Sequence, residues 1–323
     1  MIKTTVVIPN FNGIKYIEDC LISVLSSSVD VNVIVVDNNS TDGSRELVMR
    51  SFPMVRTICM DKNTGFCHAV NVGISNSNTE FVMLLNNDAI VEKEAIELLE
   101  KDLELRPKVW AAQAKMVRMS NHDIIDSAGD YYCALGWAYA LGKDKPAGLY
   151  TGKKMIFSAC GGAALYRRCV FDEIGKFDEA HFAYLEDVDM GYRANIFGYK
   201  SMADMDAVVY HAGSGSSGSR YNEFKIRHSS RNSVYLIYKN MPLGQIILNL
   251  PFLTIGYLIK IAFFTLKGFG KVYVRGLFEG FGLCMKKKDT SARIRFKAGR
   301  LSTYIALEIL LVVNVLRRFV TIQ

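Results

Sequence analysis

Short apolar segments alternate with amphipathic segments along the first two thirds of the chain. The apolar segments are rich in β-branched residues, and the segments that follow them repeat apolar residues every three or four positions, as helices do. The strands expected from this pattern are 4–8, 31–36, 81–85, 155–166 and 207–210, and the helices are 14–25, 44–51, 93–105 and 168–174. Continuously apolar strands are buried on both faces, so we predict an α/β fold with a mostly parallel sheet and helices on both faces.

The last third of the chain has a different character. It carries two long apolar segments, 243–266 and 301–316, with a basic stretch between them. From Arg220 to Gln323 there are 18 Lys and Arg against 4 Asp and Glu, a net charge of +14, which leaves 21 against 28, or −7, for the residues before them. Basic residues beside apolar helices are attracted to anionic lipid by about 1 kcal/mol each. We therefore divide the chain into an α/β domain over 1–221 and a helical, membrane-associated region over 222–323.

The two apolar segments allow three interpretations. A membrane-spanning helix needs roughly 20 mainly apolar residues. The first segment is long enough but interrupted by Asn249, Pro251 and Lys260, and the second is short. We favour helices that lie in the membrane interface or insert partly, over true spans and over a soluble helical domain. Nucleic acid explains the positive charge poorly, because the basic residues are interleaved with long aliphatic stretches and no known nucleic-acid module occurs.

Length and composition narrow the class of protein. With 323 residues, of which 50% are hydrophobic and 22% charged, the chain can build one large core with an appendage, and it is neither disordered nor a small disulfide scaffold. Its 7 cysteines include no Cys-x-x-Cys pair, which suits a reducing compartment. The chain opens directly with a strand pattern, so a cleaved secretory signal is not expected.

Candidate chemistry lies where strands end, because ligands of parallel α/β sheets bind beyond the carboxyl ends of the strands. The candidates are Asp37, Asp88, Glu186, Asp187 and His211. The carboxylate of Asp37 suits a nucleobase or ribose, while Asp88 and His211 offer oxygen and nitrogen ligands to a divalent cation. Taken singly, Asp37 also fits ordinary turn chemistry and His211 a backbone-bonded strand end. Asp189 is better explained as a helix N-terminal residue or a brace for Arg193.

The motifs resemble a known family when they are taken together. In order they are Val6-Val-Ile-Pro-Asn-Phe-Asn-Gly13, Val35-Val-Asp-Asn-Asn-Ser-Thr-Asp-Gly-Ser44, Asn63-Thr-Gly-Phe66 with Asn71-x-Gly73, Leu84-Leu-Asn-Asn-Asp88, Leu185-Glu-Asp-Val-Asp189 and His211. This succession over about residues 3–213 resembles the family 2 glycosyltransferases, and within them the rhamnosyltransferase-like branch. The resemblance implies a GT-A, Rossmann-like fold, a nucleotide-diphosphate sugar donor, a divalent cation (Mn²⁺ or Mg²⁺) and inversion at the anomeric carbon.

The resemblance also implies a role for each motif. The implied donor-binding residues are Pro9, Asn10, Asn12, Asp37, Asn39, Asn63, Gly65, Asn86 and Asn87. Asp37 would bind the nucleobase, and Asp88 and His211 would bind the metal. Asn86 stands where the family's Asp-x-Asp begins with an acid, so we expect it to hydrogen-bond the sugar nucleotide instead. Asp187 matches the catalytic base, and an inverting displacement needs one such carboxylate within about 3 Å of the acceptor hydroxyl and no enzyme nucleophile.

Two segments remain open. Residues 106–150, rich in aromatic residues and glycine, either contact the acceptor as an insertion or form a packed β-meander. The segment 213–218 spells G-x-G-x-x-G but lacks an acidic residue about 20 positions on, so a dinucleotide site is not favoured. We expect either a mobile loop that closes over the diphosphate with help from Arg220 or Arg227, or a plain linker.

The sequence thus predicts an inverting, metal-dependent glycosyltransferase on the cytoplasmic face of the cell membrane. The expected acceptor is a polyprenyl-linked or cell-surface glycan, rhamnose is one candidate sugar, and the lipid surface is a further partner, whereas nucleic acid is not; homodimerisation is left open. A non-catalytic nucleotide-sugar-binding scaffold is one alternative. A nucleotidylyltransferase is another, but it would need a glycine-rich, basic triphosphate loop where this chain has Pro9-Asn-Phe-Asn-Gly-Ile14.

Overall fold

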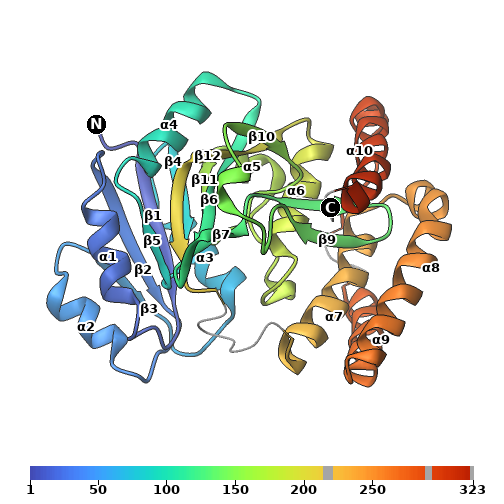
Figure 1. Cartoon of the computed structure of the whole chain (residues 1–323), viewed down its shortest axis with the longest axis horizontal. Coiled ribbons are helices and arrows are strands. Elements are labelled where there is room, and N and C mark those ends of the chain that lie inside the picture. The colour runs from blue at the N-terminus through green and yellow to red at the C-terminus, as the bar shows by residue number, and fades with distance from the viewer. Residues whose placement is uncertain (214–220, 288–292, 321–323) are drawn as a thin grey trace.

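A central mixed sheet organises the first two thirds of the molecule. The computed structural model describes residues 1–213, 221–287 and 293–320. The strands of the sheet are β1 (Thr4–Asn10), β2 (Val31–Asp37), β3 (Arg56–Cys59), β4 (Phe81–Leu85), β5 (Ala89–Val91), β6 (Val109–Arg118), β7 (Asn121–Ser127), β10 (Lys153–Ile156), β11 (Ala163–Arg167) and β12 (Lys200–His211). They are ordered β10-β12-β6-β11-β4-β1-β2-β3, with β5 beside β12 and β7 beside β6 (Figure 1). A separate hairpin pairs β8 (Asp130–Cys133) with β9 (Trp137–Ala140).

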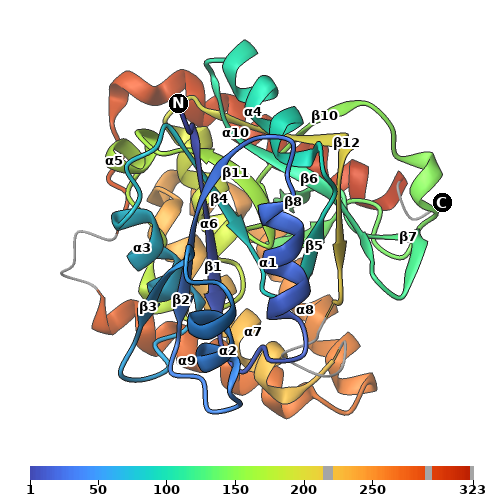
Figure 2. The same ribbon diagram turned by 90° about the vertical axis from the view of Figure 1, so that its left-hand side faces the viewer.

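Helices cover both faces of this sheet. They are α1 (Ile17–Leu25), α2 (Ser44–Ser51), α3 (Phe66–Ser75), α4 (Ala95–Leu105), α5 (Val170–Ile174) and α6 (Glu186–Ile196), followed by α7 (Glu223–Asn240), α8 (Leu243–Leu266), α9 (Gly270–Lys286) and α10 (Leu301–Val320). Apolar residues of α1, α2 and α4 pack on one face, and those of α3, α5 and α6 on the other. Figure 2 shows α1 and α3 on opposite sides of the central strands. The last four helices gather at one end of the molecule (Figure 1).

The buried strands alternate their side chains between two cores. Val6 and Ile8 of β1 enter one core, whereas Val7 enters the other, and β2 and β4 alternate in the same way. The predicted α/β fold with helices on both faces is therefore confirmed. The sheet is mixed, because β11 runs antiparallel to both β4 and β6. The single strand expected over 155–166 is wrong, since the chain leaves β10 at Ile156, loops through Cys160 and re-enters the sheet as β11.

Strand direction brings the predicted site residues to one edge of the sheet. β2 and β4 run parallel to β1, and β12 runs parallel to β6. Because β6 and β4 are both antiparallel to β11, β12 also runs in the direction of β4. The carboxyl ends of β1, β2, β4 and β12 therefore lie at the same edge, which is where ligands of α/β sheets bind.

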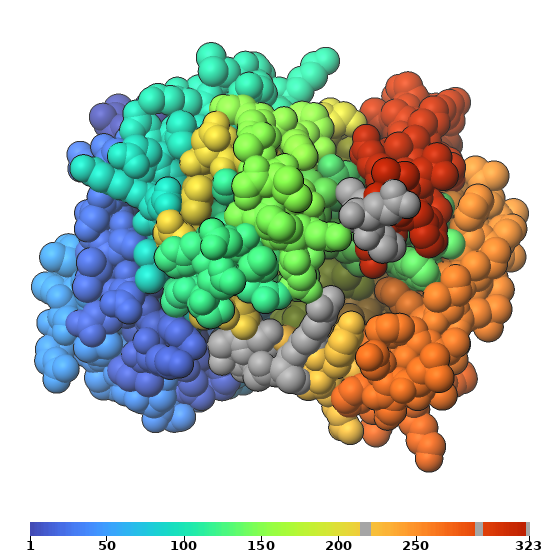
Figure 3. All heavy atoms as spheres, in the orientation of Figure 1, coloured from blue at the N-terminus to red at the C-terminus, as the bar shows by residue number. Residues whose placement is uncertain are grey.

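The helical region contacts the α/β part through the β8–β9 hairpin. The indole nitrogen of Trp137 donates to the carbonyl of Gly256 on α8 at 3.0 Å, and the hydroxyl of Tyr139 donates to the carbonyl of Asn314 on α10 at 2.8 Å. In the space-filling view, green atoms of the hairpin region lie between the red α10 and the orange α8 (Figure 3). Two aromatic residues of the segment 106–150, Trp137 and Tyr139, thus contact these two helices, and a contact of this segment with the acceptor stays a prediction.

Two helices of this region are long and apolar enough to cross a membrane. The most apolar 18-residue windows of Leu243–Leu266 and Ala298–Val320 have mean hydropathies of 1.9 and 1.5. Only 17% and 22% of their most apolar windows are buried in the molecule. The two apolar helices predicted from the sequence are therefore present, and most of their surface faces outward.

Candidate active site

A cavity of about 600 Å³ opens at the carboxyl edge of the sheet. It is lined by Pro9, Asn10, Phe11, Asn38, Asn63, Gly65, Phe66, Asn86, Asn87, Asp88, Phe182, Ala183, Tyr184, His211, Phe224 and Lys225. Eight residues predicted to bind donor or metal are among them, namely Pro9, Asn10, Asn63, Gly65, Asn86, Asn87, Asp88 and His211. The segments that supply them are far apart in the chain, so the convergence is a property of the fold.

Four predicted residues lie outside this lining. Asp37 is fully buried, and its carboxylate accepts hydrogen bonds from the amide of Asn10 at 2.9 Å and from the backbone N–H of Ser40 at 3.0 Å. The amide oxygen of Asn10 in turn accepts from the side chain of Asn87 at 2.8 Å. Asp37 thus orients Asn10, and Asn10 and Asn87 are the members of this chain of hydrogen bonds that reach the cavity.

Asn12 and Asn39 shape the turns beside the cavity. Both adopt left-handed backbone conformations, with φ of 52° and 65°, which asparagine tolerates better than most residues. The side chain of Asn12 accepts a hydrogen bond from the backbone of Thr41 at 2.9 Å. This bond joins the turn after β1 to the turn after β2. The fourth residue outside the lining is Asp187, which is described below.

Asp88 and His211 face each other at the edge of the cavity. The Oδ1 atom of Asp88 lies 3.1 Å from Nε2 of His211, and Nδ1 of the same ring lies 2.8 Å from the carboxylate of Asp126. Burial lowers the pKa of His211, but hydrogen bonds with Asp126 and Asp88 outweigh burial and raise it to about 9. A carboxylate behind a histidine fixes the ring and strengthens its other nitrogen as a ligand. The amide nitrogen of Asn86 lies 3.1 Å from that Nε2 atom.

Asp187 lies at the start of α6, beside the loop between β10 and β11. Its carboxylate accepts from the backbone N–H of Gly161 at 2.9 Å. A Cβ atom on Gly161 would lie 3.0 Å from the carboxylate of Asp187 and 3.2 Å from the ring of Phe66, which lines the cavity. The proposed base is therefore separated from a cavity-lining ring by one glycine.

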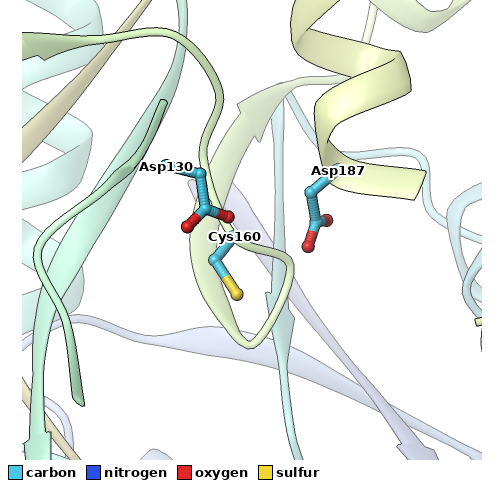
Figure 4. A group of neighbouring side chains, drawn as sticks. All are labelled: Asp130, Cys160 and Asp187. Carbon is cyan, nitrogen blue, oxygen red and sulfur yellow. The ribbon is translucent and has the colours of Figure 1, made fainter. Parts of the chain in front are cut away.

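Two further side chains surround Asp187. Potential ligand atoms of Asp130, Cys160 and Asp187 lie within 4.8 Å of one another, and Figure 4 shows them grouped around a common space. Burial and the neighbouring Glu186 raise the pKa of Asp187 well above its usual range. Burial and the charge of Asp187 also raise the pKa of Asp130, to about 8. Asp130, which comes from the β8–β9 hairpin, was not predicted from the sequence.

A strained loop leads into α6. Phe182, Tyr184 and Leu185 have φ of 63°, 71° and 66°, in the left-handed region that L side chains rarely adopt. Phe182 and Tyr184 line the cavity. Gly65 has φ of 84°, and a Cβ atom there would lie 2.5 Å from the ring of Phe182. Only glycine lets this loop approach the cavity wall so closely.

The expectation for Asp189 is confirmed. It lies in the first turn of α6, is fully buried and binds Arg193 at 2.7 Å. Burial opposes ionisation of Asp189, yet Arg193 and Lys239 hold its pKa below the usual range. Asp189 and Asp187 thus stand two residues apart in opposite electrostatic environments.

The region after the predicted boundary contributes to the cavity. Phe224 and Lys225 of α7 are lining residues that the sequence analysis missed. Arg227 is paired with the α9 residue Glu279 at 2.7 Å, and its expected role beside the diphosphate stays a prediction. The predicted loop at 213–218 and Arg220 lie almost wholly outside the described residues, which resume at 221.

The family model of glycosyl transferase family 2 matches residues 5–175, more than half of the chain. The chain belongs to glycosyl transferase family 2. It is therefore a glycosyltransferase, as predicted, and the nucleotidylyltransferase alternative is set aside. The match covers Asp37, at the end of β2, and Asp88, between β4 and β5, and it ends before α6 and His211.

Relatives and solved structures support the same assignment. The N-acetylglucosaminyl-diphospho-decaprenol L-rhamnosyltransferase of Mycobacterium tuberculosis is 25% identical over 238 residues, which are 66% of this chain and 76% of that protein. S. aureus TarS 1–349 in complex with UDP-GlcNAc has a TM-score of 0.59 at 17% identity and covers 88% of this chain and 82% of its own. The mannosyltransferase PcManGT from Pyrobaculum calidifontis, in complex with GDP-Man and Mn²⁺, has a TM-score of 0.55 at 17% identity. This match covers 95% of the present chain and 80% of PcManGT. The GT-A fold is confirmed, and the expected similarity to a rhamnosyltransferase is found in the mycobacterial relative.

Proposed function

We propose that this glycosyltransferase moves a sugar with inversion from a nucleotide-diphosphate donor to a glycan acceptor, with Asp187 as general base. The observation that carries the proposal is the convergence of strand ends on one cavity, where Asp88 and His211 lie 3.1 Å apart. Asp187 stands beside the same cavity, across Gly161 from Phe66. This arrangement supports donor binding in the cavity and acceptor attack from the side of Asp187.

The environment of Asp187 suits a general base. The acceptor hydroxyl must lose its proton as its oxygen attacks C1 of the sugar, and a carboxylate with a raised pKa is a stronger proton acceptor than an ordinary one. Burial and Glu186 raise the pKa of Asp187, and the N–H of Gly161 fixes one of its oxygens. In the proposed step the other oxygen takes the proton. Because the attack is a single displacement, no residue has to form a covalent intermediate.

Asp88 and His211 fit a divalent cation. A carboxylate oxygen and an imidazole nitrogen suit Mn²⁺, and Mg²⁺ less well, and Asp126 supplies the carboxylate that orients the ring. The group of Asp130, Cys160 and Asp187 suits these ions less, because hard cations prefer oxygen and burial raises the pKa of the Cys160 thiol. When bound, the cation would offset the negative charge of the leaving nucleoside diphosphate.

The remaining donor contacts follow from the cavity lining. Asn10, Asn63, Asn86 and Asn87 present amides that donate to and accept from ribose, phosphate and sugar oxygens. Asp37 contributes to nucleobase binding indirectly, because its carboxylate accepts a hydrogen bond from Asn10 and holds that side chain in place. Phe182 and Tyr184 offer aromatic surface to the base or the sugar.

We propose a polyprenyl-linked or cell-surface glycan as the acceptor and the cytoplasmic face of the cell membrane as the location. The mycobacterial relative bears the name of an enzyme that acts on a decaprenol-linked substrate. The outward-facing apolar surface of α8 and α10 supports a lipid surface as a partner. Rhamnose is the first sugar to test, because that relative is named as a rhamnosyltransferase.

A donor screen tests this proposal. The purified full-length protein is incubated with Mn²⁺ or Mg²⁺ and with UDP-, dTDP- or GDP-sugars, and nucleoside diphosphate release is measured with and without a polyprenyl-linked glycan. We expect release with at least one donor, and we expect Asp187→Asn to bind that donor normally but to transfer about 1,000-fold more slowly. Near-normal transfer by Asp187→Asn would reject it as the base. Donor binding without release in any combination would favour the scaffold alternative.

A further inference from the structure

α7 reaches back from the helical region to the loop that carries the proposed base. The side chain of Asn232 is fully buried. Its amide nitrogen lies 3.0 Å from the carbonyl oxygen of His181, 2.9 Å from that of Ala183 and 2.7 Å from that of Tyr184. A primary amide has two hydrogens, so one of them is shared between two carbonyls. One side chain thus holds three backbone groups of a single tight loop.

A neighbouring arginine fixes the orientation of this amide. The Nε atom of Arg231 donates to Oδ1 of Asn232 at 2.9 Å, so the amide oxygen faces the guanidinium and the amide nitrogen faces the loop. Arg231 also donates through Nη2 to the carbonyls of Ala180 and His181, at 3.0 and 2.7 Å. Arginine has no acceptor, so the flipped amide would place two donors against each other.

α7 also holds the two ends of the loop. The ammonium group of Lys239 is nearly fully buried and lies 3.0 Å from the carboxylate of Asp178 and 2.8 Å from that of Asp189. Asn240 donates to the other oxygen of Asp189 at 2.7 Å. Asp178 precedes the loop and Asp189 follows it, so α7 binds the loop before, within and after its strained part.

The loop needs such contacts to keep its shape. Left-handed conformations at Phe182, Tyr184 and Leu185 cost roughly 1–2 kcal/mol each, and they persist only where the surroundings impose them. Asp187 follows Leu185 by two residues, so the path of this backbone decides where its carboxylate lies. The carbonyls that Asn232 binds are those of the strained residues and their neighbours.

We infer that Asn232 is a positioning residue of the transfer reaction, acting through the backbone of 181–184 on the carboxylate of Asp187. The inference rests on the proposed function of Asp187 as the base. It assigns a part of catalysis to the region that the sequence marks as membrane-associated. A misplacement of about 1 Å between reacting groups costs about 100-fold in rate.

Transfer and donor hydrolysis should respond differently to loss of Asn232. The acceptor hydroxyl is held in one place by the rest of its glycan and needs the base at a fixed position. Water is small and mobile, so it can follow a displaced carboxylate. Loss of positioning therefore lowers the ratio of transfer to hydrolysis, whereas a loss of folded enzyme lowers both rates equally and leaves the ratio unchanged.

The experiment compares Asn232→Ala and Asn232→Asp with Ser229→Ala in the full-length protein. Ser229 is a half-buried residue of the same helix and serves as the matched control. Within the described part of the chain, its hydroxyl bonds to the carbonyl of Ile226 at 3.2 Å, which belongs to the same helix. Asn232→Asp keeps the volume of the side chain but replaces the donor with an acceptor. Each protein is assayed at saturating donor for sugar transfer and, without acceptor, for nucleoside diphosphate release, and its folding is checked by thermal melting.

We expect the ratio of transfer to hydrolysis to fall at least tenfold in both Asn232 variants and to stay unchanged in Ser229→Ala. Equal losses of both rates, or no loss, would overturn the positioning role. Because the ratio does not depend on the folded fraction, a partly unfolded variant still gives an answer, and Asn232→Asp gives a second one. The wild type and Asp187→Asn report on the proposed function itself, so its failure is distinguishable from failure of this inference.

Discussion

The α/β part and the helical region use apolar residues in opposite ways. In the sheet, both faces of β1, β2 and β4 are buried, and polar chemistry is confined to the strand ends. In α8, α9 and α10, large apolar side chains such as Leu258 and Phe278 remain 60% and 72% exposed. Scattered apolar residues are normal on protein surfaces, but a continuous apolar face marks an interaction surface. The α/β part therefore uses its apolar residues to form a core, whereas α8, α9 and α10 leave many of theirs exposed on the outside of the molecule.

α7 does not fit this division. It lies in the basic region, yet it buries polar side chains, and its Phe224 and Lys225 line the cavity. Close packing also joins the regions: a Cβ atom on Gly256 of α8 would lie 2.1 Å from the carbonyl oxygen of Leu135, and one on Gly280 of α9 would lie 2.5 Å from that of Arg231 on α7. The predicted boundary at residue 222 marks a change in amino-acid composition. The catalytic unit that we propose extends beyond this boundary and includes α7.

Deleting residues 222–323 should have the largest effect, and it tests whether α7 is part of the catalytic unit. We expect complete loss of transfer, even in detergent, because the deletion removes two lining residues and every α7 contact to the loop before α6. Transfer and folding of the truncated and full-length proteins are compared in the absence of membranes. Near-full turnover by the fragment would mean that the helices serve only as an anchor.

His211→Ala tests whether the α/β part holds the cation. We expect about a 100-fold loss of transfer and a higher Mn²⁺ concentration for half-maximal activity. The variant lacks one of the two implied metal ligands, and Asp126 no longer has an imidazole ring to orient. Chelation with EDTA should abolish wild-type activity, and added Mn²⁺ should restore it. His122→Ala is the control, at an exposed histidine whose ring is tilted against that of Tyr210. Equal Mn²⁺ titrations for His211→Ala and the wild type would contradict the assignment.

Phe278→Ser tests the outward apolar face of the helical region. Phe278, Phe281 and Met285 are 72%, 60% and 71% exposed and share one face of α9. Inserting a phenylalanine into lipid contributes about 1.5–3 kcal/mol, so we expect at least tenfold weaker binding to vesicles that contain anionic lipid. Met54→Ser, at a 70% exposed apolar position in the α/β part, should bind like the wild type. Equal weakening by both variants would show that the lipid surface does not prefer α9.

Glu186→Gln should change the pH dependence with the smallest effect on rate. Asp187 must be ionised to accept a proton, and burial and Glu186 raise its pKa, so activity is lost as pH falls through a value above the ordinary carboxyl range. Removing the charge of Glu186 lowers that pKa and should move the acid limb of kcat/KM to lower pH. Asp130 and Cys160 also face Asp187 and stay in place. An unmoved acid limb would mean that another group sets it.

Much of the α/β part was predictable from sequence, because apolar runs define strands and the carboxyl-edge rule brings their ends together. Asp88 and His211, 123 positions apart by number, meet as that rule expects. Strand direction is not encoded in hydrophobic periodicity, so the antiparallel β11 and the loop through Cys160 were not foreseen.

The contributions of other segments to the site were not predictable in the same way. Asp130 reaches Asp187 through a hairpin, and Asn232 reaches the loop through helix packing, and neither follows a strand end. One signal was present: Asn232, Lys239 and Asn240 are seven and eight positions apart and so share one helix face. Polar residues that repeat on a helix face among apolar neighbours indicate a buried polar contact.

The hydrogen bonds of Asn232 have a consequence for biosynthesis. The loop at 181–184 is made some 50 residues before the side chain that holds it, as the separation of 51 residues between His181 and Asn232 shows. During translation the sheet can collapse around its core while α7 is still inside the ribosome, because domains fold from the amino terminus as they emerge. The nascent chain would then have the part of the cavity that the sheet supplies, but Asp187 would not yet be held in position. It would become competent for transfer only after α7 had left the ribosome and packed against the loop.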